Sequence, residues 1–409
     1  MDTLQRAVDK LYKERFGQLV ASLLYSSRDI DPATAEDIVQ DSFSVALSHW
    51  AQNGIPLHPS AWIFKVCRNK ALNTLRCKGR MEGLSERTPI QTVESRFTES
   101  VLDDHTLSLL FAAAHPDLAP KIQIVTTLKY VINLKVEAIA KCLAMTLDSV
   151  DKLLVRARQK IKDEKILLEE PRLTELKRRL PTVHKIIYLI FNEGYKSSWG
   201  NELIREELCE EALLLNRALM ENGLGNKETA ALHALMLFNS ARFKSRFDVN
   251  GELVELENQD RTLWNHNLIS LGNHYLNESQ CETLSSYHLE AYIAYLHSTA
   301  PTFEATDWKI ITQMYAILLK NNPNPFIRLS YAVALYYDGR KEDAFRTLQE
   351  LQRLSFFNRY YLFNLTLGKL HHLEGRDAIA RTFLTEAIGQ TNFLKEKNFI
   401  ARLLASLGN

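Results

Sequence analysis

The stretch "IAKCLAMTLDSVDKLLVRARQKIK", residues 139–162, places two amphipathic segments on either side of a short break. Aliphatic residues recur with the period of an α-helix before residues 145–148 and again after them, which predicts a short helix, a tight turn and a longer helix. Thr146 or Asp148 is suited to cap the second helix, because its side-chain oxygen can accept a backbone N–H. The pattern is typical of a helix-turn-helix.

The second of these helices is predicted to have one apolar and one basic wall. The apolar wall consists of Val150, Leu153, Leu154, Ala157 and Ile161, and the basic wall of Ser149, Lys152, Arg156 and Lys160. Residues 152–162 hold five bases and no acid, and such spacing lets several cations reach phosphates at once. The alternative interpretation is an ordinary surface helix with a solvated charged face.

A second basic block is "PSAWIFKVCRNKALNTLRCKGR", residues 59–80, with six bases from Lys65 to Arg80 and no acid. On a helical wheel one face collects Trp62, Lys65, Asn69, Leu72, Asn73 and Arg76, and the other face collects Ile63, Val66, Cys67, Ala71 and Thr74. An aromatic ring, amides and bases on one exposed face can stack on an unpaired base, read base edges and bind the backbone. The alternative is that Trp62 is a core residue.

The helix predicted before this block carries an acidic ridge. "DIDPATAEDIVQDSFSVALSHW", residues 29–50, begins with Asp31 as N-cap and Pro32 at the first helical position. Its polar stripe consists of Asp37, Gln40, Asp41, Ser44 and Ser48, opposite Ile38, Val39, Phe43, Ala46 and Trp50. Such a ridge is unsuited to DNA and suits a basic protein partner.

The whole chain reads as a helical protein of the cell interior. Apolar residues make up 46% and charged residues 24% of its 409 residues, and 3.6-residue periodicity dominates. We find no membrane-spanning run and no signal peptide, and the five scattered cysteines form no CxxC, which indicates a reduced cytoplasmic protein without a structural zinc site. No motif indicates an enzyme, a metal site or a cofactor.

Residues 5–165 resemble a bacterial sigma factor of the extracytoplasmic-function class. The motifs that carry the resemblance are "AEDIVQDSFSVAL", "AWIFKVCRNKALNTLR" and, after a polar linker, the segment from "FAAAHPDLAPKIQIV" to "RARQKIK". The remainder, from "YLIFNEGYKSSWG" to "LENQDRTLWN", is similar to the subgroup with a C-terminal, tetratricopeptide-like helical extension. The resemblance implies an all-α fold divided into residues 1–78, a linker 79–104, a helix-turn-helix domain 105–165 and an extension 166–409, with repeats clearest at 323–390.

The resemblance also implies roles for individual residues. Asp37, Gln40 and Asp41 match the helix that docks on the clamp coiled coil of the largest RNA polymerase subunit. Trp62, Lys65, Asn69, Asn73 and Arg76 lie on the helix that opens and reads the minus-ten element, and the loop "NGIPLHPS" before it matches the segment that captures a flipped base. Ser149, Lys152, Arg156, Arg158 and Lys160 lie on the helix for the minus-thirty-five element, although Asp151 and Leu153 stand where related helices carry bases or amides.

These expectations amount to a sigma factor that binds core RNA polymerase and promoter DNA, directs melting and initiation, and is controlled by its extension through a regulatory protein or ligand. The alternative is a stand-alone helix-turn-helix regulator with a repeat-type sensor, and a third possibility is a scaffold with incidental basic helices. The linker either threads the polymerase channels, as in the family, or is a plain flexible tether.

In the extension we expect Pro171 and Pro181 to interrupt helices and Gly194 to form a C-cap. Asn192, Glu193 and Tyr195 are predicted to lock the extension onto the second domain or, alternatively, to bind a ligand. Asn250-Gly251 predicts a hairpin-like turn. "YAVALYYDGRKEDAF" from 331 and "LGKLHHLEGRDAIARTF" from 367 form a repeat offset by 36 residues, which predicts stacked antiparallel helix pairs.

Overall fold

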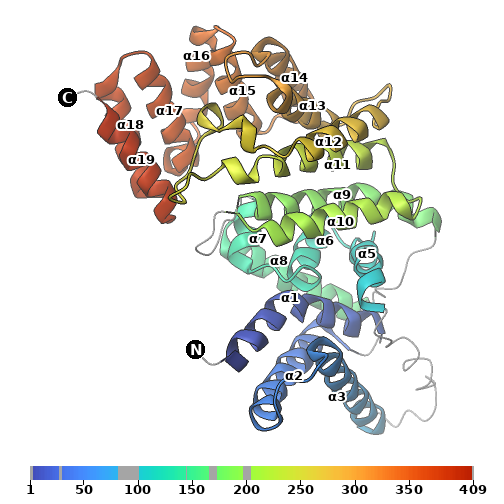
Figure 1. Ribbon diagram of the computed structural model, residues 1–409. Coiled ribbons are helices and arrows are strands. Elements are labelled where there is room, and N and C mark those ends of the chain that lie inside the picture. Colours follow the sequence, from blue (N-terminus) through green and yellow to red (C-terminus); the bar gives the residue numbers. More distant parts are fainter. Residues whose placement is uncertain are drawn as a thin grey trace. The chain divides into compact units, whose positions relative to one another are not determined.

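The computed structural model describes residues 3–26, 30–81, 101–143, 145–164, 173–196 and 204–407. The regular secondary structure in these ranges is helical, and the β-type pairing within them is one isolated bridge between Phe247 and Leu253, which confirms the predicted all-α class. The chain divides into two compact units, residues 1–224 and 225–409 (Figure 1). The predicted extension, residues 166–409, therefore spans the border between the units, and its first part belongs to unit 1.

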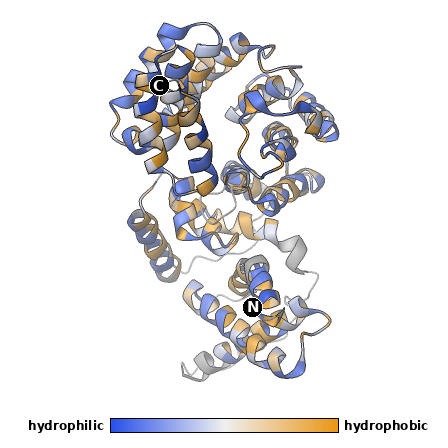
Figure 2. Ribbon diagram, turned by 60° about the vertical axis from the view of Figure 1, so that its left-hand side comes forward, coloured by the Kyte–Doolittle hydropathy of each residue, from blue (hydrophilic) through white to orange (hydrophobic). Residues whose placement is uncertain are grey.

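Unit 1 contains α1 (Thr3–Ser26), α2 (Pro32–Asn53), α3 (Pro59–Met81), α5 (Val101–Ala113), α6 (Pro120–Tyr130), α7 (Val136–Cys142), α8 (Leu147–Asp163), α9 (Leu173–Tyr195) and α10 (Glu206–Glu221). Most of the predicted linker 79–104 and Pro171 lie outside the described residues. None of the described helices is long and apolar enough to cross a bilayer. Polar and apolar residues alternate along the described helices in Figure 2.

The start of α2 follows from its sequence. The Asp31 side chain accepts a hydrogen bond from the Thr34 backbone N–H at 2.9 Å, and Pro32 occupies the first helical position, where a missing N–H costs nothing. The residues predicted to face inward are all buried: Ile38, Val39, Phe43, Ala46 and Trp50. The helix ends at Gly54, whose φ of +79° is one that residues with a side chain rarely adopt.

Two predictions about α9 are wrong. Pro181 lies inside the helix rather than ending it, because its side chain and Lys177, whose carbonyl loses its helical donor, are both exposed to solvent. Gly194 is not a C-cap but part of the last turn of α9, where a Cβ would lie 2.7 Å from Cys209 Sγ and 2.8 Å from the Arg205 carbonyl oxygen. The glycine thus permits the close approach of α9 to α10, which run side by side in Figure 1.

We expect Gly194→Ala to destabilise unit 1 by about 1–3 kcal/mol, because the added methyl group meets backbone atoms that cannot move without separating α9 from α10. The matched control is Gly389→Ala, which adds a methyl group to an exposed helical glycine with nothing within 4 Å and should be neutral or stabilising by about 0.5–1 kcal/mol. Urea denaturation of the full chain measures both. Equal stability of the two variants would contradict the close-approach role.

Unit 2 contains α11 (Lys227–Ser240), α12 (His266–Glu278), α13 (Ser286–Thr299), α14 (Trp308–Asn321), α15 (Pro325–Tyr337), α16 (Lys341–Gln352), α17 (Tyr361–Leu373), α18 (Asp377–Gln390) and α19 (Leu394–Ser406), with short 3-10 turns η1 (Phe243–Ser245), η2 (Leu256–Asn258), η3 (Arg261–Leu263) and η4 (Phe357–Arg359).

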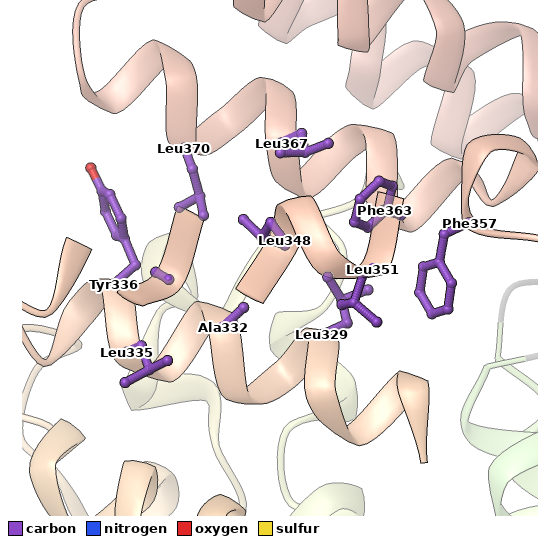
Figure 3. Close-up of a cluster of buried hydrophobic side chains, with 11 residues drawn as sticks. Leu329, Ala332, Leu335, Tyr336, Leu348, Leu351, Phe357, Phe363, Leu367 and Leu370 are labelled. Atoms are coloured by element: carbon purple, nitrogen blue, oxygen red, sulfur yellow. The ribbon is translucent and has the colours of Figure 1, made fainter. Parts of the chain in front are cut away.

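The predicted repeat of 36 residues corresponds to two equivalent helix pairs, α15–α16 and α17–α18. Gly339 and Gly375 have φ values of +82° and +69° at the two turns. The Arg340 N–H bonds the Leu335 carbonyl at 2.9 Å, and the Arg376 N–H bonds the equivalent His371 carbonyl at the same distance. Ala344 and Ala380 are fully buried at the helix crossings. Figure 3 shows the apolar core between α15, α16 and α17, built largely of leucine with Tyr336, Phe357 and Phe363.

Asn250-Gly251 forms the predicted turn, which opens a strap of residues 246–257. The Asp248 N–H bonds the Glu252 carbonyl at 2.9 Å, Gly251 has a φ of +74°, and Phe247 pairs with Leu253. Beyond the turn the strap is tied to α19, where Asn398 Nδ2 donates to Glu252 at 3.0 Å and Arg402 donates to the Leu253 carbonyl at 3.1 Å. The strap is therefore a fixed part of unit 2.

Candidate nucleic-acid interface

The outward face of α3 carries polar side chains, as predicted. Lys65, Asn69 and Asn73 are exposed at one-turn spacing, and the opposite face is anchored by Ile63, Cys67 and Ala71, each 1% exposed or less. Arg76 lies on α3, but its side chain is outside the described residues. Exposed amides and a lysine in a row are able to contact base edges and phosphates.

Two members of the predicted outward face of α3 lie deeper. Leu72 is buried, because it points into the core beneath the helix and not beside Asn69 and Asn73. Trp62 is half-buried, with its ring 5.4 Å from that of Trp50 and 5.1 Å from that of His49. The tryptophan thus joins α3 to α2 while part of its ring stays accessible for stacking.

The loop between α2 and α3, residues 54–58, presents apolar side chains to solvent. Leu57 is 90% exposed and Ile55 is 42% exposed. The Gly54 N–H closes α2 on the Trp50 carbonyl at 2.9 Å, and the Trp62 N–H bonds the His58 carbonyl at 3.1 Å, so both ends of the loop are fixed. A loop that is fixed at both ends and exposes a leucine almost completely is suited to contact a partner molecule.

Asp37, Gln40 and Asp41 are exposed on α2, as the polar stripe predicts. Asp41 forms an ion pair with Lys70 of α3 at 3.2 Å, and its side chain is 72% exposed. An exposed pair of this kind contributes about 0–1 kcal/mol and leaves the carboxylate available to another cation. The acidic ridge of α2 and the polar face of α3 therefore lie on neighbouring helices of one body.

Helix α7 ends at Cys142 and α8 begins at Leu147, so the break between them lies close to the predicted residues 145–148. The Ser149 N–H bonds Thr146 Oγ1 at 3.2 Å, so Thr146 caps α8, whereas Asp148 pairs with Lys152 at 2.6 Å. The apolar wall is confirmed: Val150, Leu154 and Ala157 are buried, and Leu153 and Ile161 pack beside Leu118 and Ile122.

Part of the basic wall of α8 is exposed to solvent. Lys152 and Arg156 are exposed, and Lys160 is half-buried with Glu164 at 3.6 Å. Arg158 instead turns inward, where its Nε donates to the Tyr130 hydroxyl at 2.7 Å. Leu153 packs into the apolar cluster, which explains the absence of a polar side chain at that position.

Helix α9 packs on α5–α8 through polar contacts between residues far apart in the sequence. Cys142 Sγ of α7 donates to Glu193 Oε2 at 3.3 Å, and Glu193 is 2% exposed. Burial and the neighbouring Glu193 raise the pKa of the Cys142 thiol, which therefore stays protonated and serves as the donor.

Two more polar contacts hold α9 on the same helices. Arg179 donates to the Phe111 carbonyl at 2.8 Å, and Thr182 donates to Gln123 at 3.1 Å. The contact of Glu193 agrees with the predicted locking role of the segment 192–195.

Comparison with known proteins relates part of the chain to a known family of domains. Residues 13–81, which cover α2, α3 and most of α1, match the sigma-70 region 2. The N-terminal helices of the chain therefore carry a sigma-70 region 2. The chain is also related along its length to the uncharacterized protein R00370 of Rhizobium meliloti (strain 1021), at 32% identity over 399 residues that cover 95% of this chain and 93% of that protein.

Outside region 2, the chain matches a family of unknown function (DUF6596) over residues 179–280, from α9 to α12. No solved structure matches the chain. The tetratricopeptide-like nature of the extension therefore stays a prediction, although its helix pairs are described above. Among the described residues no group of histidine, cysteine and acidic side chains could hold a metal ion.

Proposed function

We propose that the chain is a sigma factor of the extracytoplasmic-function class, which binds core RNA polymerase and directs promoter recognition and melting. The observation that carries the proposal is region 2 itself, in which an exposed acidic ridge on α2 adjoins an exposed polar face on α3. A protein that binds only duplex DNA would have no use for the ridge, because carboxylates repel phosphates. An acidic surface on α2 next to a polar, partly basic surface on α3 suits a protein that binds polymerase and DNA at the same time.

The α3 face and the loop before it are assigned to the minus-ten element. Lys65, Asn69 and Asn73 supply a cation and two amides, and the accessible part of Trp62 supplies a stacking surface worth about 1–3 kcal/mol per base. The exposed Leu57 in the preceding loop offers an apolar contact beside them. Together these groups favour an unpaired strand over a duplex.

Helix α8 is assigned to the minus-thirty-five element through a helix-turn-helix with α7. Lys152 and Arg156 are exposed, and the half-buried Ser149 lies in the first turn of α8, where Thr146 caps its N–H. Arg158 serves mainly to hold α8 on Tyr130. The first turns of a recognition helix are the ones that contact base edges, and the exposed bases of α8 begin there.

Electrophoretic mobility shifts with promoter DNA test this function. We expect weak binding by the protein alone, and a specific complex with a melted segment once core polymerase is added. Tight sequence-specific binding by the protein alone, unchanged by core polymerase, would instead identify a stand-alone regulator.

The double variant Lys152→Gln, Arg156→Gln should weaken binding of the polymerase complex to duplex upstream DNA. Loss of two phosphate contacts should lower the slope of log affinity against log salt by about 2. The exposed Lys309→Gln in unit 2 is the control and should leave the slope unchanged. Fluorescence anisotropy over a salt series measures both; an unchanged slope in the double variant would remove α8 from the interface.

A further inference from the structure

Unit 2 holds a cavity of about 280 Å³ that no comparison assigns to a function. It lies among α13, α14, α15 and α17 and is closed on one side by the strap. Its lining contains the aromatic residues Phe303, Trp308, Tyr315 and Tyr337 together with Glu255, Glu257, Lys369 and His297. Since a water molecule takes about 30 Å³, the cavity has room for a small organic group.

Three of the aromatic residues, Phe303, Trp308 and Tyr337, form one connected wall. The ring of Trp308 lies 5.0 Å from that of Phe303 and 4.8 Å from that of Tyr337. Their polar atoms are already used, because the Trp308 indole N–H donates to the Phe303 carbonyl at 3.3 Å and the Tyr337 hydroxyl donates to Glu257 at 3.1 Å. A ligand can therefore contact the faces and edges of these rings rather than their polar atoms.

Two carboxylates beside this wall share one ammonium group. Glu255 and Glu257 both accept from the same Lys369 Nζ, at 2.6 Å and 3.1 Å, so one negative charge is in excess whenever both carboxylates are ionised. The side chains are only 21%, 27% and 19% exposed, respectively. Burial raises the pKa of Glu255, Lys369 acts against this shift, and Glu257 adds to it.

The imidazole of His297 also lines this cavity. Its Nδ1 is buried and has no hydrogen-bond partner within the described part of the chain. Burial, with Arg242 and Arg261 nearby, lowers the pKa of His297 to about 3, so the imidazole is neutral at physiological pH. A neutral imidazole is able to accept a hydrogen bond from an N–H donor and does not repel a cation.

From this arrangement we infer that the cavity binds a small organic cation, an ammonium group that the aromatic wall surrounds and that the carboxylates neutralise. Cations over aromatic rings are attracted by the ring quadrupole, most strongly where water is excluded. The ammonium group could belong to a free amine or to a lysine side chain of a peptide. Because the strap that carries both carboxylates is fixed to α19, the site is preformed.

Titration calorimetry on the full chain tests the inference with two probes, choline and N-acetyl-lysine methylamide. Each is compared with an uncharged isostere in which carbon replaces the charged nitrogen. We expect at least one cation to bind about tenfold or more tightly than its isostere. Preference for choline would indicate a free amine and preference for the lysine derivative a peptide. If neither cation exceeds its isostere, the inference is wrong.

Glu257→Gln keeps the shape of the site and removes the excess charge, so it should weaken cation binding about tenfold. The control Glu374→Gln changes a carboxylate with similar partners elsewhere, Tyr336 at 2.7 Å and Lys341 at 2.7 Å, and should leave binding unchanged. Equal loss in both variants would contradict a local site. The comparison of isosteres needs no variant and is independent of the sigma-factor assignment.

Discussion

A chain cut after Glu164, one residue before the boundary that the sequence predicts, is expected to lose its cooperative fold, whereas a chain cut after Leu224 keeps it. The shorter piece lacks α9 and α10, which belong to the same compact unit as α1–α8. Removing α9 leaves the Phe111 carbonyl, Gln123 and Cys142 without the partners described above. It also removes a row of buried apolar side chains: Leu180, Val183, Ile186, Ile187, Leu189, Ile190 and Phe191.

Each large apolar side chain is worth about 1.5–3 kcal/mol when buried, and a domain is stable by only about 5–15 kcal/mol in total. Circular dichroism melting and size-exclusion chromatography of the pieces 1–164 and 1–224 measure the difference. A cooperative, monomeric 1–164 as stable as 1–224 would contradict the assignment of α9 and α10 to unit 1. The piece 1–224 is also the one to use when asking whether unit 2 activates or inhibits transcription.

Asp41→Arg is expected to abolish binding to core polymerase, with a loss in affinity of about a hundredfold or more. Reversing the charge removes one attraction and adds a repulsion against a basic partner, and truncating or reversing a paired charge at an interface costs about 2–5 kcal/mol. The fold should survive, because the pair with Lys70 is exposed and contributes about 1 kcal/mol at most.

Surface plasmon resonance with immobilised core polymerase measures this loss. The matched control is Glu386→Arg, a charge reversal at an exposed acid of α18, which should bind like the unchanged protein. Unchanged binding by Asp41→Arg with a normal melting curve would show that the α2 ridge is not the docking surface.

The helical stripes and the turns were predictable because they depend on local spacing. The buried and exposed residues of α2, the apolar wall of α8 and the repeat of Gly339 and Gly375 all follow from periodicity or from backbone conformations that favour glycine. The polar ridge of α2 was found in the same way, since its members recur at helical spacing.

Most of the wrong predictions have a different cause, which is contact with other segments of the chain; Pro181 is the exception, because its place inside α9 depends on local exposure to solvent. Gly194 is needed for α10, and Arg158 is held by Tyr130, 28 residues earlier. A helical wheel places Leu72 beside Asn69 and Asn73 on the outward face, yet the core beneath α3 extends to its side chain, which is buried. The cavity of unit 2 joins Glu255 to Lys369, 114 positions away, and no local pattern predicts such a meeting.

The central claim is that the chain gives core polymerase the ability to start at promoters. Transcription in vitro from a pool of DNA fragments, with bacterial core polymerase and with or without the purified full chain, tests it most directly. We predict that defined start sites appear only when the chain is present and that they share elements near minus ten and minus thirty-five. The same scattered, weak transcripts with and without the chain, under conditions in which it binds core, would contradict the claim.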